Sequence, residues 1–303
     1  MLVTLLKSTI LVLLTLSINT TVPPAVATTL PGAGSTTNTA KIIFEKDDLI
    51  VGPVDPDNPY QPIIPEQPGQ PTGGLLSIDF VSNLYFGQGS IDRIDRTYYA
   101  RPMLATISKK NGKKAQQEFF PNFVQITDRR PDVEGWMLSV RQDVQFRWVG
   151  ASPDVTGEAE GRPGDFLAGA RLTFSHGRTT TGHNRPDETV PNYAGGVSTI
   201  LVPGVLSAPV LSANTGQGKG TWHYAVGNPL PPEITEDMLD EIEEGGGDFS
   251  KFIEAGYYDN YRMDKGQAPR FGPITLHVPR ITAQRSAGYQ SLFTWTLSDV
   301  PRN

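Results

Sequence analysis

The sequence of 303 residues contains no cysteine. This absence excludes disulfides, thiolate metal ligands, thiol nucleophiles and a lipid attached through an N-terminal cysteine. Basic residues are outnumbered, because 26 Lys and Arg stand against 32 Asp and Glu, and the net charge is −6. Nucleic-acid-binding proteins usually present a basic face. We therefore expect no nucleic-acid partner.

Charged residues are also few, at 19% of the chain, whereas there are 31 glycines and 26 prolines. A composition rich in turn formers and poor in helix formers favours an all-β fold. The length is sufficient to bury a hydrophobic core without disulfides or metals.

Long apolar runs are missing, and the one short run lies near the N-terminus. Residues Ile10–Ile18 are almost all apolar and follow Lys7, and Ala25-Val26-Ala27 has the small-x-small pattern of a cleavage site. The run is shorter than the ~20 residues that a membrane span needs. This order is typical of a secretory signal peptide. We predict a signal peptide at residues 1–27 and an exported mature chain without a membrane span, with an uncleaved anchor as the alternative.

Residues 28–74 are predicted to form a Thr/Gly- and Pro-rich segment with one short strand at Lys41–Phe44. Prolines recur at every third position: Pro53, Pro56, Pro59, Pro62, Pro65, Pro68 and Pro71. Polyproline II has three residues per turn, so these prolines would share one face of an extended rod. The repeat predicts a stiff spacer or a strap along another surface, and the alternative is a linker with accidental regularity.

The main domain is predicted at residues 75–303, where apolar and polar residues alternate with a period of two, as in half-buried strands. Trp136–Trp148 shows this best and predicts one strand or two strands in phase. The same alternation occurs at Ile78–Phe80, Leu172–Phe174, Trp222–Val226, Ile274–Val278 and Phe293–Leu297. Short strands between turn-forming clusters predict an all-β, sandwich-like domain of antiparallel strands with long loops.

One acidic segment departs from this pattern. Glu233–Asp248 carries eight acidic residues and no basic one, and Ile234, Met238 and Ile242 recur every four residues. This spacing predicts a short amphipathic helix, which Gly245-Gly246-Gly247 would end. We interpret residues 233–248 as a solvated helical insertion; the alternative is a patch that binds a cation or a partner.

Two motifs give the chain a resemblance to a known family. Trp136-Met137-Leu138 lies in mid-chain, and the pattern Y-x-x-x-(L/F)-T-W-x-L-x-D-x-P runs from Tyr289 to Pro301. This pair resembles the WxL family of surface proteins of Gram-positive bacteria. Phe293 stands where that family more often has Leu. Further similar stretches are Leu76–Ser82, Gly135, Leu167–Leu172 and Gly216–Trp222.

The resemblance implies a β-rich domain that attaches non-covalently to the cell wall through peptidoglycan, together with companion surface proteins. The segment after Pro301 contains no sortase signal, so we expect no covalent tether. The expected location is the cell surface, after secretion. The alternative is an adhesin or complex subunit that binds host or plant polymers, or companion proteins, rather than peptidoglycan directly.

The motif residues are the first candidates for a binding site: Trp136, Leu138, Tyr289, Trp295 and Leu297. A spacing of two puts Trp and Leu on the same face of a strand, and that face is the apolar one. Each Trp would bury ~150–250 Å². We therefore favour core positions for both Trp residues over platforms for sugar rings.

Exposed Tyr and Arg side chains are the second candidates, because they suit the sugar faces, amides and carboxylates of peptidoglycan. The candidate surface contacts are Arg129, Arg130, Tyr257, Tyr258 and Arg262. The alternative is that these are ordinary exposed residues without a role in binding.

No catalytic motif is found. The four histidines are scattered, and neither H-E-x-x-H nor G-x-S-x-G occurs. We predict that the protein is not an enzyme and has no cofactor, no metal and no catalytic residue.

Overall fold

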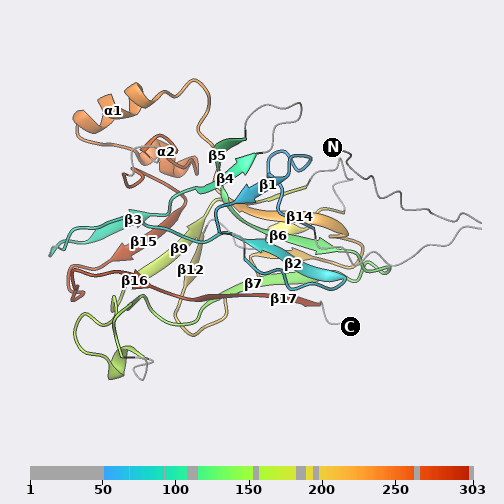
Figure 1. Cartoon of the computed structure of the whole chain (residues 1–303), viewed down its shortest axis with the longest axis horizontal. Helices are drawn as coiled ribbons and strands as arrows, with labels where there is room; N and C mark the ends of the chain where they lie inside the picture. Colours follow the sequence, from blue (N-terminus) through green and yellow to red (C-terminus); the bar gives the residue numbers. More distant parts are fainter. Residues whose placement is uncertain are drawn as a thin grey trace, which may run out of the picture. The chain divides into compact units, whose positions relative to one another are not determined.

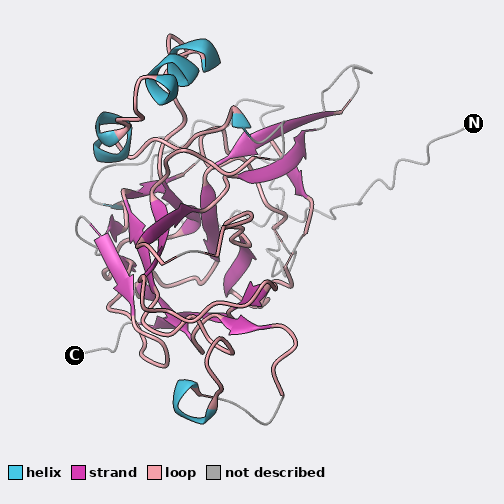
Figure 2. Ribbon diagram, turned by 90° about the vertical axis from the view of Figure 1, so that its left-hand side faces the viewer, coloured by secondary structure: helices cyan, strands magenta, loops and turns pink. Residues whose placement is uncertain are grey.

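The computed structural model describes residues 51–299 except 68, 92, 108–114, 153–156, 182–188, 194–197 and 263–266. Residues Ile50–Asn303 form one compact unit. Strands dominate its ribbon, and every paired strand is antiparallel to its neighbours (Figure 2). This confirms the all-β, sandwich-like fold. The predicted signal peptide and the predicted strand at Lys41–Phe44 lie outside the described residues.

Two four-stranded sheets form the layers of the sandwich (Figure 1). The first contains, in spatial order, β10 (Gly177–Thr180), β14 (Gly220–Val226), β6 (Asn122–Asp128) and β2 (Leu76–Val81). The second contains β11 (Asn192–Tyr193), β13 (Leu211–Ala213), β7 (Trp136–Gln142) and β17 (Phe293–Asp299).

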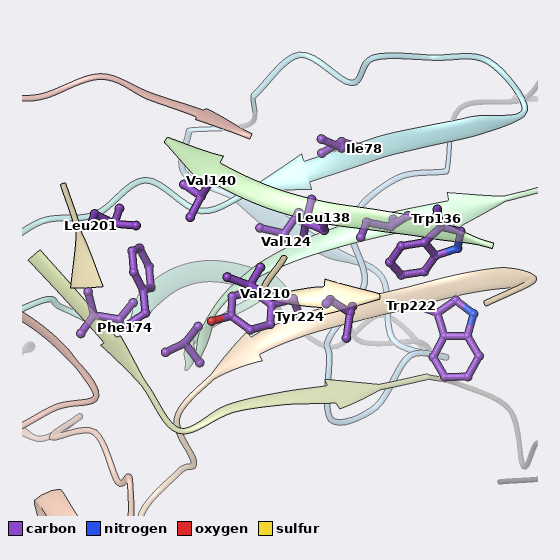
Figure 3. Packing of buried hydrophobic residues seen from close by; sticks show 14 of the residues in the cluster. Ile78, Val124, Trp136, Leu138, Val140, Phe174, Leu201, Val210, Trp222 and Tyr224 are labelled. Atoms are coloured by element: carbon purple, nitrogen blue, oxygen red, sulfur yellow. The ribbon is translucent and has the colours of Figure 1, made fainter. Parts of the chain in front are cut away.

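The core between these layers takes one face of each sheet. Val124 and Trp222 come from the first sheet and Trp136 and Leu138 from the second, and all four are buried (Figure 3). Alternating inward side chains from two facing sheets are the arrangement that a sandwich requires. The period-two pattern at Trp136 and Trp222 is therefore confirmed as a core signal.

A third four-stranded sheet adds Leu172, Phe174 and Ile274 to the same core. Its strands are, in spatial order, β12 (Ser198–Leu201), β9 (Arg171–Ser175), β15 (Ile274–Val278) and β3 (Arg96–Tyr99). A ribbon pairs β8 (Arg147–Trp148) with β16 (Tyr289–Gln290). The predicted Trp136–Trp148 segment is thus two strands, β7 and β8.

Strand β6 is buried on both faces. Val124 faces the main core, whereas Phe123 packs into a second cluster. That cluster includes a three-stranded sheet of β1 (Ile63–Pro65), β4 (Met103–Ile107) and β5 (Gln116–Phe120). A strand covered on both sides can carry apolar residues on both faces, and in β6 the adjacent apolar residues Phe123 and Val124 interrupt the alternation.

Ile78 and Phe80 do not share a face, contrary to the pattern in the sequence. The register with β6 shifts between these two residues, so Ile78 joins the main core and Phe80 joins the second cluster. A β-bulge inserts one residue and reverses which face the next side chain takes. The extra residue, Asp79, is buried and accepts hydrogen bonds from Ser77, Gln125 and Thr127.

The predicted proline rod is wrong over its first half, because the chain turns back on itself. Val54 forms a bridge with Pro62, and the Asp55 amide donates to the Gln61 carbonyl at 3.0 Å. The turn lies on the domain itself, since the Val54 amide donates to Gln125 Oε1 at 3.0 Å. β1 then pairs with β4. Hydrogen bonds and burial outweigh the preference of proline for an extended rod.

The predicted helix within residues 233–248 is confirmed as α1 (Glu236–Glu244). Thr235 caps it by accepting from the Met238 amide, and Gly245 ends it. Leu239 is fully buried, whereas Met238 is 44% exposed. Leu239, Phe249 and Phe271 form a small cluster, here called the helical cluster, and a second short helix, α2 (Ser250–Glu254), packs Phe252 against it.

The helical insertion is fastened to the domain by charge. Arg270, which is 8% exposed, pairs with buried Asp259 at 2.8 Å and with Asp240 of α1 at 2.6 Å. Charged groups are buried only when they are paired. The insertion is therefore attached to the domain through side chains, and only part of it is solvated.

Candidate functional site

The two W-x-L motifs lie side by side, because β7 and β17 are neighbouring strands (Figure 1). The pairing is antiparallel, with the two motifs offset by two residues. The facing pairs are Leu138 with Leu297, Val140 with Trp295, and Trp136 with Asp299. The sequence separates the two copies by more than 150 positions and carries no signal for this pairing.

Trp136 is completely buried, and its indole Nε1 donates to the carbonyl of Gly218 at 3.1 Å. The backbone closes around it. Gly218 has φ of +80°, and a Cβ there would stand 2.5 Å from Trp136 Nε1. Gly135 has φ of +82°, and its Cβ would lie 2.3 Å from the carbonyl oxygen of Ala213. Only glycine tolerates both a positive φ and so close an approach of neighbouring atoms. Gly135 and Gly218 therefore allow the backbone to pack closely around Trp136.

Arg130 connects the ends of the two motifs. It forms ion pairs with Asp128 at 2.8 Å and with Asp299 at 2.5 Å, and it donates to the carbonyl of Gly135 at 2.8 Å. Its side chain is 13% exposed and that of Asp128 is 1% exposed. The hydrogen bond to Asp128 raises the pKa of Arg130 above its ordinary value. Arg130 was predicted as a surface contact, and the structure places it in a clamp between the motifs.

Trp295 lies in a different environment from Trp136. Its ring is only partly buried and contacts Phe174 at 6.2 Å and Tyr224 at 6.1 Å between ring centroids. Phe174 and Tyr224 lie at the end of the core remote from Trp136 (Figure 3). Trp295 also lines a cavity of about 350 Å³. The second motif therefore contributes both to the core and to a cavity wall.

A second, larger cavity of about 910 Å³ adjoins the first. Its lining includes the motif residue Tyr289 and the charged residues Arg101 and Arg285. The two cavities share five lining residues: Leu84, Tyr85, Gln290, Ser291 and Phe293. We call the two together the double cavity. Small-molecule sites fall within roughly 300–1,000 Å³, so each part is large enough for a ligand.

Tyr289 is half-buried, and its hydroxyl acts as both a hydrogen-bond donor and a hydrogen-bond acceptor. The hydroxyl donates to the carbonyl of Gly164 at 2.7 Å and accepts from the Arg285 amide at 2.8 Å. Arg285 in turn lies over the Trp148 ring at 4.8 Å and pairs with Asp165 at 2.9 Å. Tyr289 therefore fixes the loop that borders the larger cavity.

The other predicted surface contacts lie elsewhere, and none of them lines either cavity. Tyr258 is only 4% exposed, which corrects the expectation of an exposed aromatic; burial raises its pKa above the ordinary value. Tyr257 packs on the helical cluster, and Arg262 is paired with Glu243. Arg129 is half-buried at the end of β6. These residues do not converge on one site.

Tyr85 and Leu292 are site candidates that sequence reasoning missed. Tyr85 is 50% exposed, borders both cavities and donates from its hydroxyl to Gln67 at 2.6 Å. Leu292 is 66% exposed and borders the smaller cavity. Both lie in loops without periodicity, so no pattern in the sequence points to them.

Nothing in the described part of the chain forms a metal centre of three or more His, Asp or Glu side chains. His223 is fully buried, with its ring nitrogens 3.3 Å from Gln125 Oε1 and from the Thr180 carbonyl. Burial lowers its pKa to about 4. Across the described ranges, no helix is long and apolar enough to cross a membrane.

The comparisons with known proteins agree with the paired motifs. A family model described as "WxL domain surface cell wall-binding" matches residues 32–301. No curated protein matches the chain. No solved structure matches it either.

Proposed function

This chain belongs to the WxL family of surface cell-wall-binding proteins, and from that premise we propose that it holds peptidoglycan of a Gram-positive wall non-covalently through the double cavity. The family places it at the cell surface as a binding protein. The finer assignment to peptidoglycan and to this site is our proposal.

The observation that carries the proposal is the chemistry of the double cavity. Aromatic and aliphatic side chains line its smaller part together with neutral amides, among them Phe293, Trp295, Gln290 and Asn122, and the larger part adds Arg101 and Arg285. Sugar rings and acetyl groups have apolar faces beside hydroxyl and amide groups. A mainly apolar cavity with a few polar groups suits such a ligand.

The two motifs have separate parts in this proposal. Trp136 and Leu138 are fully buried and shape the fold. Trp295 supports the cavity wall from β17. Direct contact is assigned to exposed side chains at the rim, among them Tyr85 and Leu292, which both border the smaller cavity.

The test is sedimentation of the purified protein with peptidoglycan, before and after the attached wall polymers are removed. We expect sedimentation with bare peptidoglycan and a loss of at least tenfold in affinity for Tyr85→Ala. Tyr60→Ala is the matched control, because Tyr60 is 75% exposed and lines neither cavity. Sedimentation only with polymer-bearing walls would contradict the proposal.

We also propose that the protein is secreted through the leader at residues 1–27 and works within a surface complex. Support comes from the Lys7 and Ile10–Ile18 pattern and from the surface location of the family. Mass measurement of the mature N-terminus tests the first part, with Thr28 as the expected first residue. Cross-linking on intact cells tests the second, and recovery of the protein uncross-linked to any other surface protein would contradict it.

A further inference from the structure

The smaller part of the double cavity has a wall without charge. None of the described residues that line it is Asp, Glu, Lys, Arg or His. Its deep wall is aromatic and aliphatic, with Phe174, Tyr224 and Val226 each almost fully buried. Burying a charged group there without a partner would be costly. The cavity is therefore suited to a neutral group.

One buried acceptor lies in that wall without a partner. Asn122 is 6% exposed, and its side-chain amide donates to the Arg101 carbonyl at 2.8 Å. Its Oδ1 has no hydrogen-bond partner in the part of the chain that the structure describes. Asn122 has the same parity as the core residue Val124 on β6, so both side chains take the inner face. A buried acceptor that is left unpaired destabilises the fold because it has lost its hydrogen bonds to water, and a ligand donor would remove that cost.

Resting on the proposed function, we propose that this cavity is a site for the acetamido group of a neutral N-acetylated amino sugar. The acetamido N–H would donate to Asn122 Oδ1, and the methyl group would lie against the apolar wall beside Trp295. The Trp295 side chain, which lines the cavity, would lie against the sugar. The volume of about 350 Å³ is at the low end of the range for small-molecule sites, which fits one sugar residue rather than a chain.

The same amide chemistry exists in alanyl peptides, which are a second component of peptidoglycan. The absence of charge among the described lining residues favours the neutral sugar, since a free peptide end carries a carboxylate. Three probes separate the sources: chitotriose carries acetamido groups, cellotriose is neutral and lacks them, and N-acetyl-alanyl-alanine is the peptide.

Isothermal titration of the full chain with these probes is the experiment. We expect chitotriose to bind at least tenfold more tightly than cellotriose or the peptide. Asn122→Ala should weaken chitotriose binding by at least tenfold. Its matched control is Asn228→Ala, because Asn228 also donates to a backbone carbonyl, that of Ala255, but lines neither cavity.

A surface variant keeps the test valid if Asn122→Ala fails to fold. Leu292→Glu puts a carboxylate at the rim of the cavity, where Leu292 is 66% exposed. It should weaken chitotriose binding at least tenfold, whereas Ile281→Glu, at an 86% exposed position outside both cavities, should leave it unchanged.

The inference is overturned if chitotriose and cellotriose bind equally, if the peptide binds best, or if chitotriose does not bind. In the last case, continued sedimentation with bare peptidoglycan would leave the proposed function standing. If the protein neither bound chitotriose nor sedimented with bare peptidoglycan, the proposed function would be contradicted as well.

Discussion

The two copies of one motif occupy different environments although their strands are neighbours. Trp136 is fully buried, donates a hydrogen bond to Gly218 and is enclosed by glycine backbone. Trp295 is partly exposed, lies on the edge strand β17 and borders a cavity. The same three-residue pattern therefore has a purely structural role at one position and borders a cavity at the other.

This difference shows that a motif does not by itself locate a ligand. β7 is an inner strand and β17 is the edge of the same sheet. An inner strand has neighbours on both sides, whereas an edge strand has one, which leaves the side chains of β17 fewer contacts. The position of each strand within the sheet, rather than the motif, decides which Trp is near the cavity.

The largest expected effect comes from truncating each Trp. Trp136→Ala should lower the free energy of unfolding by about 3–5 kcal/mol, because it empties a fully buried site. Trp295→Ala should cost about 1–2 kcal/mol, because the ring is already partly exposed. Urea denaturation of both variants measures the difference. Equal losses would show that the two copies have the same structural role.

The clamp between the motifs gives the next effect. Arg130→Ala should cost about 3 kcal/mol, because it leaves Asp128 buried without a cation. Asp299→Ala should cost less than about 1 kcal/mol, since the Asp299 side chain is 68% exposed. Chemical denaturation at low salt checks both values. A larger loss for Asp299→Ala would mean that the clamp depends on its exposed partner.

Acid should lower the stability of the domain as a whole through His223 of β14. His223 lies between Trp222 and Tyr224, and burial lowers its pKa from 6.5 to about 4. The unfolded chain then binds more protons than the folded one between these values, so stability is present above pH 6.5 and declines toward pH 4. The loss is at most about 3 kcal/mol.

Denaturation midpoints between pH 7 and pH 4 test this expectation. His223→Gln is the control, because a neutral amide cannot titrate in this range and its pH dependence should be flatter. An unchanged slope in that variant would assign the acid sensitivity to other groups.

The last expected effect is a difference between two glycines near Trp136. Gly216→Ala and Gly218→Ala share the strain of a positive φ, +89° and +80°, of about 1–2 kcal/mol. A Cβ at Gly216 meets nothing within 4 Å, whereas at Gly218 it overlaps Trp136 Nε1 at 2.5 Å. Overpacking should add about 1–3 kcal/mol to Gly218→Ala alone. Equal decreases in the melting temperature of the two variants would show that the loop moves to accommodate the added Cβ.

Alternation of apolar and polar residues predicted most of the core strands, but it missed β6. β7, β9, β14, β15 and β17 each show a period of two in the sequence. β6 does not, because Phe123 and Val124 are buried on opposite faces. The bulge at Asp79 and the turn from Val54 to Pro62 were also missed. Both depend on partners in β6 that local pattern cannot reveal.

The candidate site was predicted only in part. The motif residues were identified, and Trp136 was correctly favoured as core. The clamp at Arg130 and the rim at Tyr85 were not foreseen, since each joins segments far apart in the chain. A contact between distant segments has no periodicity of its own.

The sequence by itself determined the fold class, the acidic helix and the family, because backbone periodicity and local motifs are properties of neighbouring residues. Only the tertiary structure decided that the two motifs pair, that Trp136 is enclosed while Trp295 borders a cavity, and that Asn122 Oδ1 is left without a partner there. The reason is physical. Burial, charge pairing and cavities arise where sheets meet. The residues that come together there are far apart in the chain, and no local pattern connects them.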